Sequence, residues 1–173
     1  MNIVLLGYRG TGKSVIGKIL AQKLKRPLFR LDDRIAQLAA MPIPKIVSEW
    51  GWPRFREMES RVVEEVCGQA QDAVIDCGGG VILGDQNILH LRKNGKTVLL
   101  KADFNTIMKR IKNDANRPPL KPGMSFEEEQ KAILLEREAK YLAAADMICD
   151  TTHLKPKEIA QAIIEYFKRK SWI

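Results

Sequence analysis

The sequence predicts an α/β fold in which helices cover both faces of a central parallel sheet of five strands. Short apolar runs alternate along the chain with longer segments of helical periodicity. These runs are apolar on both faces, which suits strands buried in a parallel sheet better than strands with one solvated face. The chain has 173 residues, of which 45% are hydrophobic and 29% charged. That size and composition predict a single domain spanning residues 1–173.

The expected elements follow in order along the chain. Strands are predicted at 2–6, 27–31, 73–77, 97–101 and 147–149. Helices are predicted at 13–24, 55–69, 88–92, 106–112, 126–145 and 156–170. Ser125 and Glu128 form a capping box that marks the start of the helix at 126–145. Because ligands of such sheets bind at the carboxyl ends of the strands, we expect the functional residues to follow strands.

The net charge is compatible with several kinds of partner and does not distinguish between them. The chain carries 29 Lys and Arg against 21 Asp and Glu, a net charge of +8. Such a charge serves solubility, or it attracts nucleic acid, an acidic membrane or phosphorylated small molecules. The three cysteines, Cys67, Cys77 and Cys149, are far apart and in no Cys-x-x-Cys pair, which predicts reduced thiols. With no apolar run near the roughly 20 residues of a membrane span and no secretory signal, a cytoplasmic protein is expected.

A phosphate-binding loop follows the first predicted strand. Gly7–Ser14 reads G-x-x-x-x-G-K-S and leads directly into the first helix. Its glycines let backbone N–H groups turn inward around a phosphate, and the helix start adds partial positive charge. Lys13 can reach the β- and γ-phosphates, and the Ser14 hydroxyl can coordinate Mg²⁺. We refer to this segment as the P-loop, and it predicts a nucleoside triphosphate ligand.

Three classes of P-loop protein are compatible with this motif. A small GTPase needs Asn-Lys-x-Asp to recognise guanine, and the sequence has no such tetrapeptide. Motor and helicase ATPases are usually larger than this chain. A small-molecule kinase fits the length, provided that the chain supplies an acceptor site and a lid that keeps water from the phosphoryl group.

Further motifs follow the P-loop in order. They are Leu31-Asp32-Asp33, Phe55-Arg56-Glu57-Met58-Glu59, Gly78-Gly79-Gly80, Arg117-Pro-Pro-Leu120, and Glu136-Arg137-Glu138 with Tyr141 after it. In these motifs the chain resembles the shikimate kinases, nucleoside-monophosphate-kinase-like P-loop enzymes, over nearly its whole length. The resemblance implies a three-layer P-loop kinase fold, a helical substrate-binding segment at about 32–60, and a lid at about 113–123. It implies transfer of the γ-phosphoryl group of ATP, with Mg²⁺, to the shikimate 3-hydroxyl, giving shikimate 3-phosphate and ADP for aromatic amino acid biosynthesis.

The resemblance assigns the acceptor site to residues after the second and third strands and on two helices. It implies that Arg56 and Arg137 hold the substrate carboxylate, for which a planar guanidinium fork is better suited than lysine. The backbone of Gly78-Gly79-Gly80 would lie against the substrate ring. Asp32 would bind the acceptor hydroxyl and accept its proton, with Asp33 the competing choice under a one-residue shift.

The resemblance also assigns the nucleotide site. Arg110 would pack on the adenine face, His153 would lie in the adenine-side loop, and Arg117 would offset charge on the transferred phosphoryl group. The expected catalytic residues are then Lys13, Asp32 and Arg117. The expected nucleotide-binding residues are Gly10, Thr11, Gly12, Lys13, Ser14, Val15, Arg110, Arg117 and His153.

One position departs from the family pattern. The family usually has Asp-x-Asp at the end of the second strand, and here Arg30 stands in place of the first Asp. Asp76 is the natural substitute, because it ends a hydrophobic strand as a Walker B aspartate does. We therefore expect Ser14 and Asp76 to hold the metal ion.

Two alternatives stay open at this point. One is a related P-loop kinase for another small hydroxy acid or a nucleotide. The other is a basic module that binds nucleic acid and uses the nucleotide as a switch, although the chain is only 6% aromatic and has no aromatic-rich basic stretch to stack bases. The first expectation is a monomer that takes shikimate and binds neither nucleic acid nor membrane.

Overall fold

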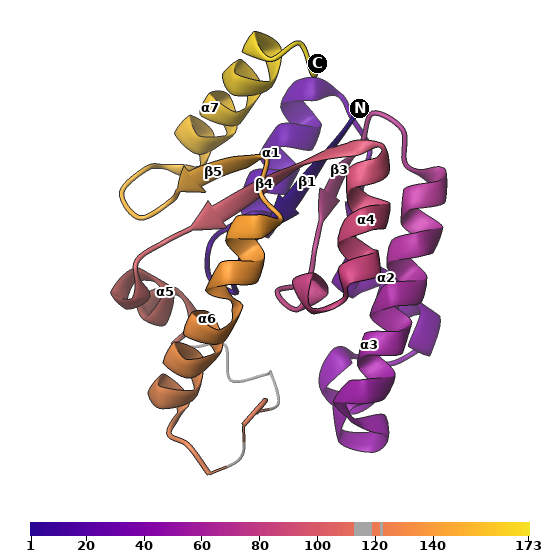
Figure 1. Cartoon of the computed structure of the whole chain (residues 1–173), viewed down its shortest axis with the longest axis vertical. Coiled ribbons are helices and arrows are strands. Elements are labelled where there is room, and N and C mark those ends of the chain that lie inside the picture. Colours follow the sequence, from indigo (N-terminus) through magenta and orange to yellow (C-terminus); the bar gives the residue numbers. More distant parts are fainter. Residues whose placement is uncertain (113–118, 122) are drawn as a thin grey trace.

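A five-stranded parallel sheet forms the centre of the molecule. The computed structural model describes residues 1–112, 119–121 and 123–173, and its strands lie in the order β2-β3-β1-β4-β5 (Figure 1). All four neighbouring pairs are parallel, as predicted. The strands are β1 (Asn2–Leu6), β2 (Leu28–Arg30), β3 (Val74–Asp76), β4 (Gly95–Lys101) and β5 (Met147–Asp150).

Helices connect the strands and cover both faces of the sheet. In the described part of the chain they are α1 (Lys13–Leu24), α2 (Leu31–Ala39), α3 (Ile43–Gln69), α4 (Asp85–Lys93), α5 (Phe104–Ile111), α6 (Phe126–Ala143) and α7 (Pro156–Arg169). A short 3₁₀ turn, η1 (Val81–Leu83), follows β3. The capping box at Ser125 and Glu128 is formed as predicted. No helix of the described residues is long and apolar enough to cross a membrane.

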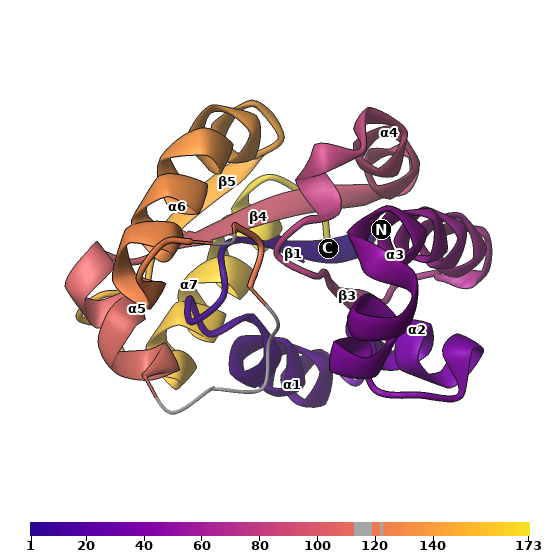
Figure 2. The ribbon, with the colours of Figure 1, turned by 90° about the horizontal axis from the view of Figure 1, so that it is seen from below.

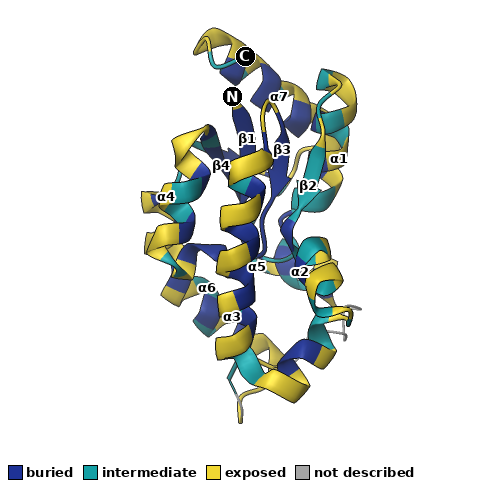
Figure 3. Ribbon diagram, turned by 90° about the vertical axis from the view of Figure 1, so that its right-hand side faces the viewer, coloured by how far each residue is buried: buried dark blue, intermediate teal, exposed yellow. Residues whose placement is uncertain are grey.

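The strand residues alternate between two hydrophobic clusters. Ile3 and Leu5 of β1 face α1 and α7, whereas Val4 and Leu6 face the cluster beneath α2, α3, α4 and α6. Seen from below in Figure 2, α1 and α7 lie on one side of the sheet and α3, α4 and α6 on the other. Figure 3 shows the central strands buried and the outer faces of the helices exposed. The three-layer arrangement predicted from the sequence is confirmed.

The stretch between β2 and β3 differs from the expected elements. The second strand was expected to run to residue 31, but it ends at Arg30, and Leu31 begins α2. Likewise, α3 begins at Ile43, well before the predicted start at 55. Gly51 interrupts α3 with a positive φ of 78°, which glycine adopts without strain. This break and the Pro53 after it obscure the helical periodicity, which explains why the first part of α3 was missed.

Candidate active site

The P-loop wraps around the start of α1. Gly10 and Gly12 adopt positive φ values of 79° and 94°, and Lys13 begins the helix. The Lys13 amino group donates to the carbonyls of Gly7 at 2.7 Å and Tyr8 at 3.0 Å, so it lies across the loop. The Thr11 hydroxyl donates to the Tyr8 carbonyl at 2.7 Å and is buried. The Thr11 backbone N–H also donates to the Tyr8 carbonyl, at 3.4 Å, so both donors of this residue lie within the loop.

Oxygen ligands for a cation gather at the start of α1 and the end of β3. The Ser14 hydroxyl donates to the Asp76 carboxylate, and burial raises the pKa of Asp76 although Lys13 and Ser14 counteract the shift. No group of three or more His, Cys, Asp or Glu side chains able to hold a metal occurs in the described residues. Mg²⁺ usually takes one or two protein oxygens together with phosphate oxygens and water, so Ser14 and Asp76 fit it.

Arg30 lies next to this pair, as its place in the sheet dictates. Arg30 and Asp76 are register partners at the ends of β2 and β3. The Arg30 Nε atom lies 3.6 Å from the Asp76 carboxylate, and its Nη1 atom lies 2.7 Å from Asp33. Arg30 thus bridges the two acidic groups. Asp76, the carboxylate expected to replace the first Asp of the family pattern, thus lies beside Arg30 on the neighbouring strand.

A hollow opens above the P-loop, which we call the P-loop hollow. Arg110 closes one end by donating to the carbonyls of Gly10 at 3.1 Å and Thr151 at 2.7 Å. Exposed Val15 also lines it. His153 is exposed and is not among the lining residues. The wall is completed by Arg9, Gly10, Gly12, Lys13, Ser14, Arg30, Asp32, Asp76, Cys77, Gly78, Gly79 and Ile111.

A second hollow lies between α3 and α6, and we call it the α3–α6 hollow. Arg56 of α3 projects into it, donates to Glu59 at 2.6 Å, and lies over the Trp52 ring at 5.4 Å. A Cβ atom on Gly80 would lie 2.2 Å from the Arg56 guanidinium nitrogens. Only glycine at this position therefore leaves Arg56 its place.

The opposite wall of this hollow comes from α6. Arg137 is buried and donates to the Gly79 carbonyl at 3.2 Å. The Tyr141 hydroxyl donates to the same carbonyl. The two guanidinium groups predicted to hold a carboxylate, those of Arg56 and Arg137, thus line one hollow from two different helices.

Asp32 lies where the two hollows meet. It belongs to the first turn of α2, and it lines both hollows together with Arg9, Gly78 and Gly79. Its Oδ1 atom would be 2.7 Å from a Cβ on residue 78, so glycine there lets the turn approach the carboxylate. Asp33, the competing choice, is exposed, pairs with Arg30 and lines neither hollow.

Glu59 is the buried acid of the α3–α6 hollow. It is 1% exposed. Desolvation raises its pKa, and the attraction of Arg56 and Arg137 only partly offsets that shift. The Asp32 carboxylate raises the pKa further. The hollow is therefore lined by three guanidinium groups, those of Arg9, Arg56 and Arg137, and three carboxylates, those of Asp32, Glu59 and Glu129. This arrangement suits a ligand that carries both an acid and hydroxyl groups.

The remaining predicted residue lies outside the described part of the chain. Arg117 and most of the predicted lid at 113–123 fall among the residues that are not described. Several residues that line the α3–α6 hollow had no individual role predicted, although some fall in the predicted substrate-binding segment or lid. They are Tyr8, Arg9, Ile43, Trp52, Phe55, Glu59, Leu120, Glu129 and Gln130. Of these, Glu59 carried a usable signal, because it lies three residues after Arg56 and on the same helix face.

The chain is similar to known proteins over nearly its whole length. A family model described as shikimate kinase matches residues 9–168. A shikimate kinase of Thermodesulfovibrio yellowstonii is 37% identical over 98% of this chain and 96% of that protein. One of Pelotomaculum thermopropionicum is 36% identical over 99% and 98%.

Solved structures give the same result. Shikimate kinase from Acinetobacter baumannii in complex with shikimate has a TM-score of 0.91 and 28% identity, covering 98% of this chain and 93% of that one. The enzyme from Aquifex aeolicus has a TM-score of 0.84 and 26% identity, covering 99% and 98%. The P-loop, the paired arginines and these matches together show that the chain belongs to the shikimate kinase family, whose members are ATP- and Mg²⁺-dependent transferases.

Proposed function

We propose that this chain transfers the γ-phosphoryl group of ATP to the 3-hydroxyl of shikimate, giving shikimate 3-phosphate and ADP. The observation that carries the proposal is the meeting of two hollows at Asp32, Gly78 and Gly79. One hollow is built on a phosphate-binding loop and the other on two guanidinium groups. Such an arrangement supports direct transfer between two bound substrates, which needs positioning and electrostatics and no covalent intermediate on the enzyme.

On the nucleotide side, the P-loop binds the phosphates. The N–H groups of residues 10–14 surround them, and Lys13 leaves its backbone carbonyls to offset charge on the β- and γ-phosphates. Arg110 and Val15 border the space for the base and ribose, with His153 in the loop after β5. Arg117 keeps its predicted role of stabilising the transferred group.

On the acceptor side, each side chain has one task. Arg56 and Arg137 hold the substrate carboxylate from opposite walls. The turn at Gly78-Gly79-Gly80 lies close to the ring because it carries no side chain. Asp32 orients the 3-hydroxyl and accepts its proton as the new P–O bond forms.

The metal ion fits at Ser14 and Asp76. When bound there, Mg²⁺ supplies positive charge to the phosphate oxygens. Arg30 pairs with Asp76 across the strands. When the metal ion binds, Arg30 therefore has to share the Asp76 carboxylate with the ion or to pair with Asp33 alone.

The test is the release of ADP with ATP, Mg²⁺ and an acceptor panel of shikimate, quinate, gluconate and a nucleoside monophosphate. Of the four acceptors, we expect only shikimate to give rapid release of ADP. A ³¹P–¹H correlation spectrum of the product should place the phosphate on the 3-oxygen. Equal or faster release with another acceptor would assign the α3–α6 hollow to that compound. Without an acceptor, release is expected to be slow, because transfer to water is disfavoured.

The proposal extends to the surroundings of the protein. We propose a monomer that works in the cytoplasm and binds neither nucleic acid nor membrane. Sedimentation of the purified chain tests the first point. A steep salt dependence of binding to random oligonucleotides would contradict the absence of a nucleic-acid partner.

A further inference from the structure

A chain of buried hydrogen bonds runs from the P-loop to a segment on the far side of the α3–α6 hollow. The Tyr8 hydroxyl donates to Gln130 Oε1 at 2.6 Å, and Gln130 Nε2 donates to Glu129 Oε2 at 3.0 Å. The other oxygen of Glu129 accepts from the backbone N–H groups of Leu120 at 2.5 Å and Lys121 at 2.6 Å. We call Tyr8, Gln130 and Glu129 the relay, and residues 119–121 the strap.

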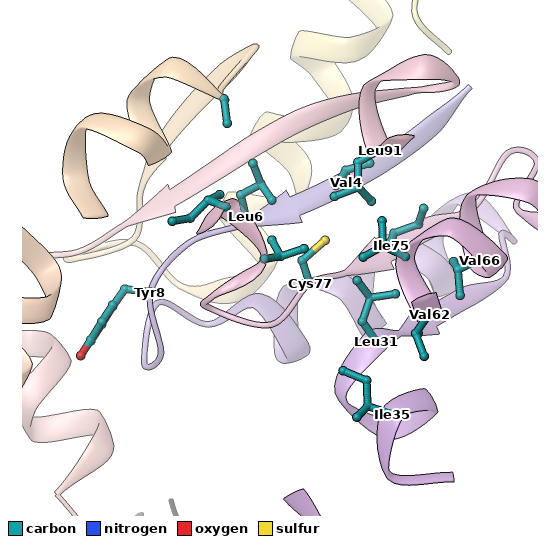
Figure 4. Close-up of a cluster of buried hydrophobic side chains, with 14 of the residues drawn as sticks. Val4, Leu6, Tyr8, Leu31, Ile35, Val62, Val66, Ile75, Cys77 and Leu91 are labelled. Carbon is teal, nitrogen blue, oxygen red and sulfur yellow. The ribbon is translucent and has the colours of Figure 1, made fainter. Parts of the chain in front are cut away.

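The relay is buried along its length. The exposed fractions are 4% for Tyr8, 2% for Gln130 and 5% for Glu129. Each polar atom in it has a defined partner, and a buried carboxylate that accepts two N–H groups holds them more firmly than an exposed one. Figure 4 shows the Tyr8 side chain beyond the end of β1, apart from the other labelled core residues. Its ring packs with the core, while its hydroxyl is committed to α6.

A neighbouring contact supports the same connection. Arg9, the next residue of the P-loop, lies with its guanidinium 5.7 Å from the centre of the Phe126 ring. Two successive P-loop side chains therefore contact the first turns of α6. A shift of the P-loop has to be accommodated by these turns, and Glu129 lies on them.

The strap forms part of the wall around the acceptor. Leu120 lines the α3–α6 hollow, and the Pro119 carbonyl accepts from Trp52 Nε1 at 3.2 Å. Trp52 in turn lies against Arg56. The strap thus contacts the element that carries one of the two carboxylate-binding arginines.

We infer that the relay is a positioning unit that couples nucleotide binding at the P-loop to shikimate binding in the α3–α6 hollow. Phosphate held by the P-loop fixes Tyr8, and Tyr8 fixes the strap through Gln130 and Glu129. Each ligand then binds more tightly when the strap is ordered, and each favours the ordered strap when bound. The binding of one ligand therefore strengthens the binding of the other. This inference rests on the proposed function, because it takes shikimate as the second ligand.

The test measures this coupling by calorimetry. The dissociation constant of shikimate is determined without and with saturating ADP and Mg²⁺, and the ratio of the two values is the coupling. The variant Tyr8→Phe removes a single hydroxyl and keeps the ring. We expect it to lower the ratio about three- to ten-fold toward one, the factor that one buried hydrogen bond provides. The variant Glu129→Gln places an NH₂ group opposite the Gln130 NH₂ group and so loses the hydrogen bond between them. This variant should lower the ratio by a similar factor.

Three further measurements separate coupling from general damage. Because Tyr8 and Glu129 act through one unit, the double variant should lower the ratio no further than the stronger single variant. Tyr166→Phe makes the same chemical change on α7, which lines neither hollow, and should leave the ratio unchanged. Glu136→Gln breaks the exposed pair of the strap residue Lys121 at 2.7 Å and should also leave it unchanged.

The outcomes are distinct. The inference is overturned if the ratio is one in the unchanged protein, or if Tyr8→Phe and Glu129→Gln keep the ratio of the unchanged protein. It is also overturned if Glu136→Gln lowers the ratio as much as they do, because any disturbance of the strap would then suffice. In each of these cases, phosphorylation of shikimate by the unchanged protein leaves the proposed function standing. If the unchanged protein neither binds nor phosphorylates shikimate, both fail.

Discussion

The two hollows of this protein are built in different ways. The P-loop hollow takes six lining residues from one short segment, residues 9–15, at the start of α1, and the others come from β2, α2, β3 with the turn after it, and α5. Its Lys13 side chain contacts its own loop. The α3–α6 hollow is formed by side chains from the P-loop, α2, α3 and α6, together with Leu120 and the backbone of the glycine turn after β3. Of its charged groups, Arg56 pairs with Glu59 at 2.6 Å, and Arg137 donates to the Gly79 carbonyl at 3.2 Å.

This difference has consequences for how each hollow tolerates change. Backbone recognition in the P-loop hollow depends on chain conformation, so substitutions that strain the backbone should harm folding and nucleotide binding together. Recognition in the α3–α6 hollow depends on side-chain charge and position. Substitutions there should harm acceptor binding or turnover and spare the nucleotide.

The largest effect is expected for Asp32→Asn, at the point where the hollows meet. The amide can still orient a hydroxyl but cannot take its proton, so kcat should fall about 10²- to 10⁴-fold. ADP affinity, measured by calorimetry, should stay nearly the same. Asp33→Asn makes the same change at the adjacent, exposed carboxylate and should keep its turnover. Equal loss of ADP affinity in Asp32→Asn, or loss of turnover in Asp33→Asn, would contradict the role of Asp32.

The next effect is expected for Arg137→Lys on the acceptor side. Lysine replaces a planar fork by a single charged donor, and one charge-assisted hydrogen bond contributes roughly 1.5–3 kcal/mol. The KM for shikimate should therefore rise about ten- to hundred-fold while the KM for ATP is unchanged. Arg54→Lys, at an exposed pair with Glu57, is the matched control. A rise in the KM for ATP would show that Arg137 acts on nucleotide binding and would contradict its assignment to the acceptor.

Two glycines contrast the halves directly. A Cβ at Gly7 would lie 2.4 Å from the carbonyl oxygen of Leu100, a backbone atom of β4 that cannot move aside. Gly7 also has a φ of +142°, which strains any other residue. Gly7→Ala should lower the free energy of unfolding by about 1–3 kcal/mol, as measured in urea. At Gly80 the neighbour is the mobile end of Arg56. Gly80→Ala should keep most of the stability and raise the KM for shikimate about ten-fold. Similar stability losses in both variants would remove the contrast.

The smallest effect is a pH dependence of stability at Glu59. Burial raises the pKa of this carboxyl above its ordinary value of 4.5, so the folded chain holds the proton more tightly than the unfolded chain. The corresponding stability is present below the ordinary pKa and is lost as pH rises through the raised value. Glu59→Gln does not titrate. Urea unfolding at about pH 4 and pH 8 should therefore show the variant gaining stability relative to the unchanged protein as pH rises.

A matched control and an opposite result define this test. Glu57→Gln changes an exposed carboxylate two residues earlier and should show a smaller pH-dependent difference. A constant difference between Glu59→Gln and the unchanged protein across this range would contradict the raised pKa. The variant should also bind shikimate more weakly, because Glu59 holds the Arg56 guanidinium at 2.6 Å.

The same contrast explains what the sequence could predict. The P-loop is a contiguous motif between a strand and a helix, so the sequence alone predicted a phosphate-binding loop and proposed tasks for Lys13 and Ser14 within it. The sheet and most of its helices followed from periodicity, but periodicity predicted no helix at α2, and Gly51 and Pro53 disrupt it in α3. Arg56 and Arg137 lie 81 positions apart and on different helices, so only the family resemblance paired them. The relay was missed because Tyr8, Glu129 and Gln130 carry no motif, and their association exists only in the folded chain.

Arg30 is an instructive case between these extremes. Its departure from the family pattern is visible in the sequence, from which we predict that Asp76 replaces the missing carboxylate. That the two residues are partners on adjacent strands is visible only in the sheet register. The exchange leaves a carboxylate beside Ser14 and adds a guanidinium next to it.

The central claim is that nucleotide and shikimate bind in two hollows that meet at Asp32. The most direct measurement is a crystal structure of the protein with ADP, Mg²⁺ and shikimate bound together. We predict the shikimate carboxylate between Arg56 and Arg137, its 3-hydroxyl on Asp32, and the β-phosphate on the P-loop amides. A shikimate molecule bound elsewhere, or one whose 3-hydroxyl faces away from Asp32 and the P-loop, would contradict the claim.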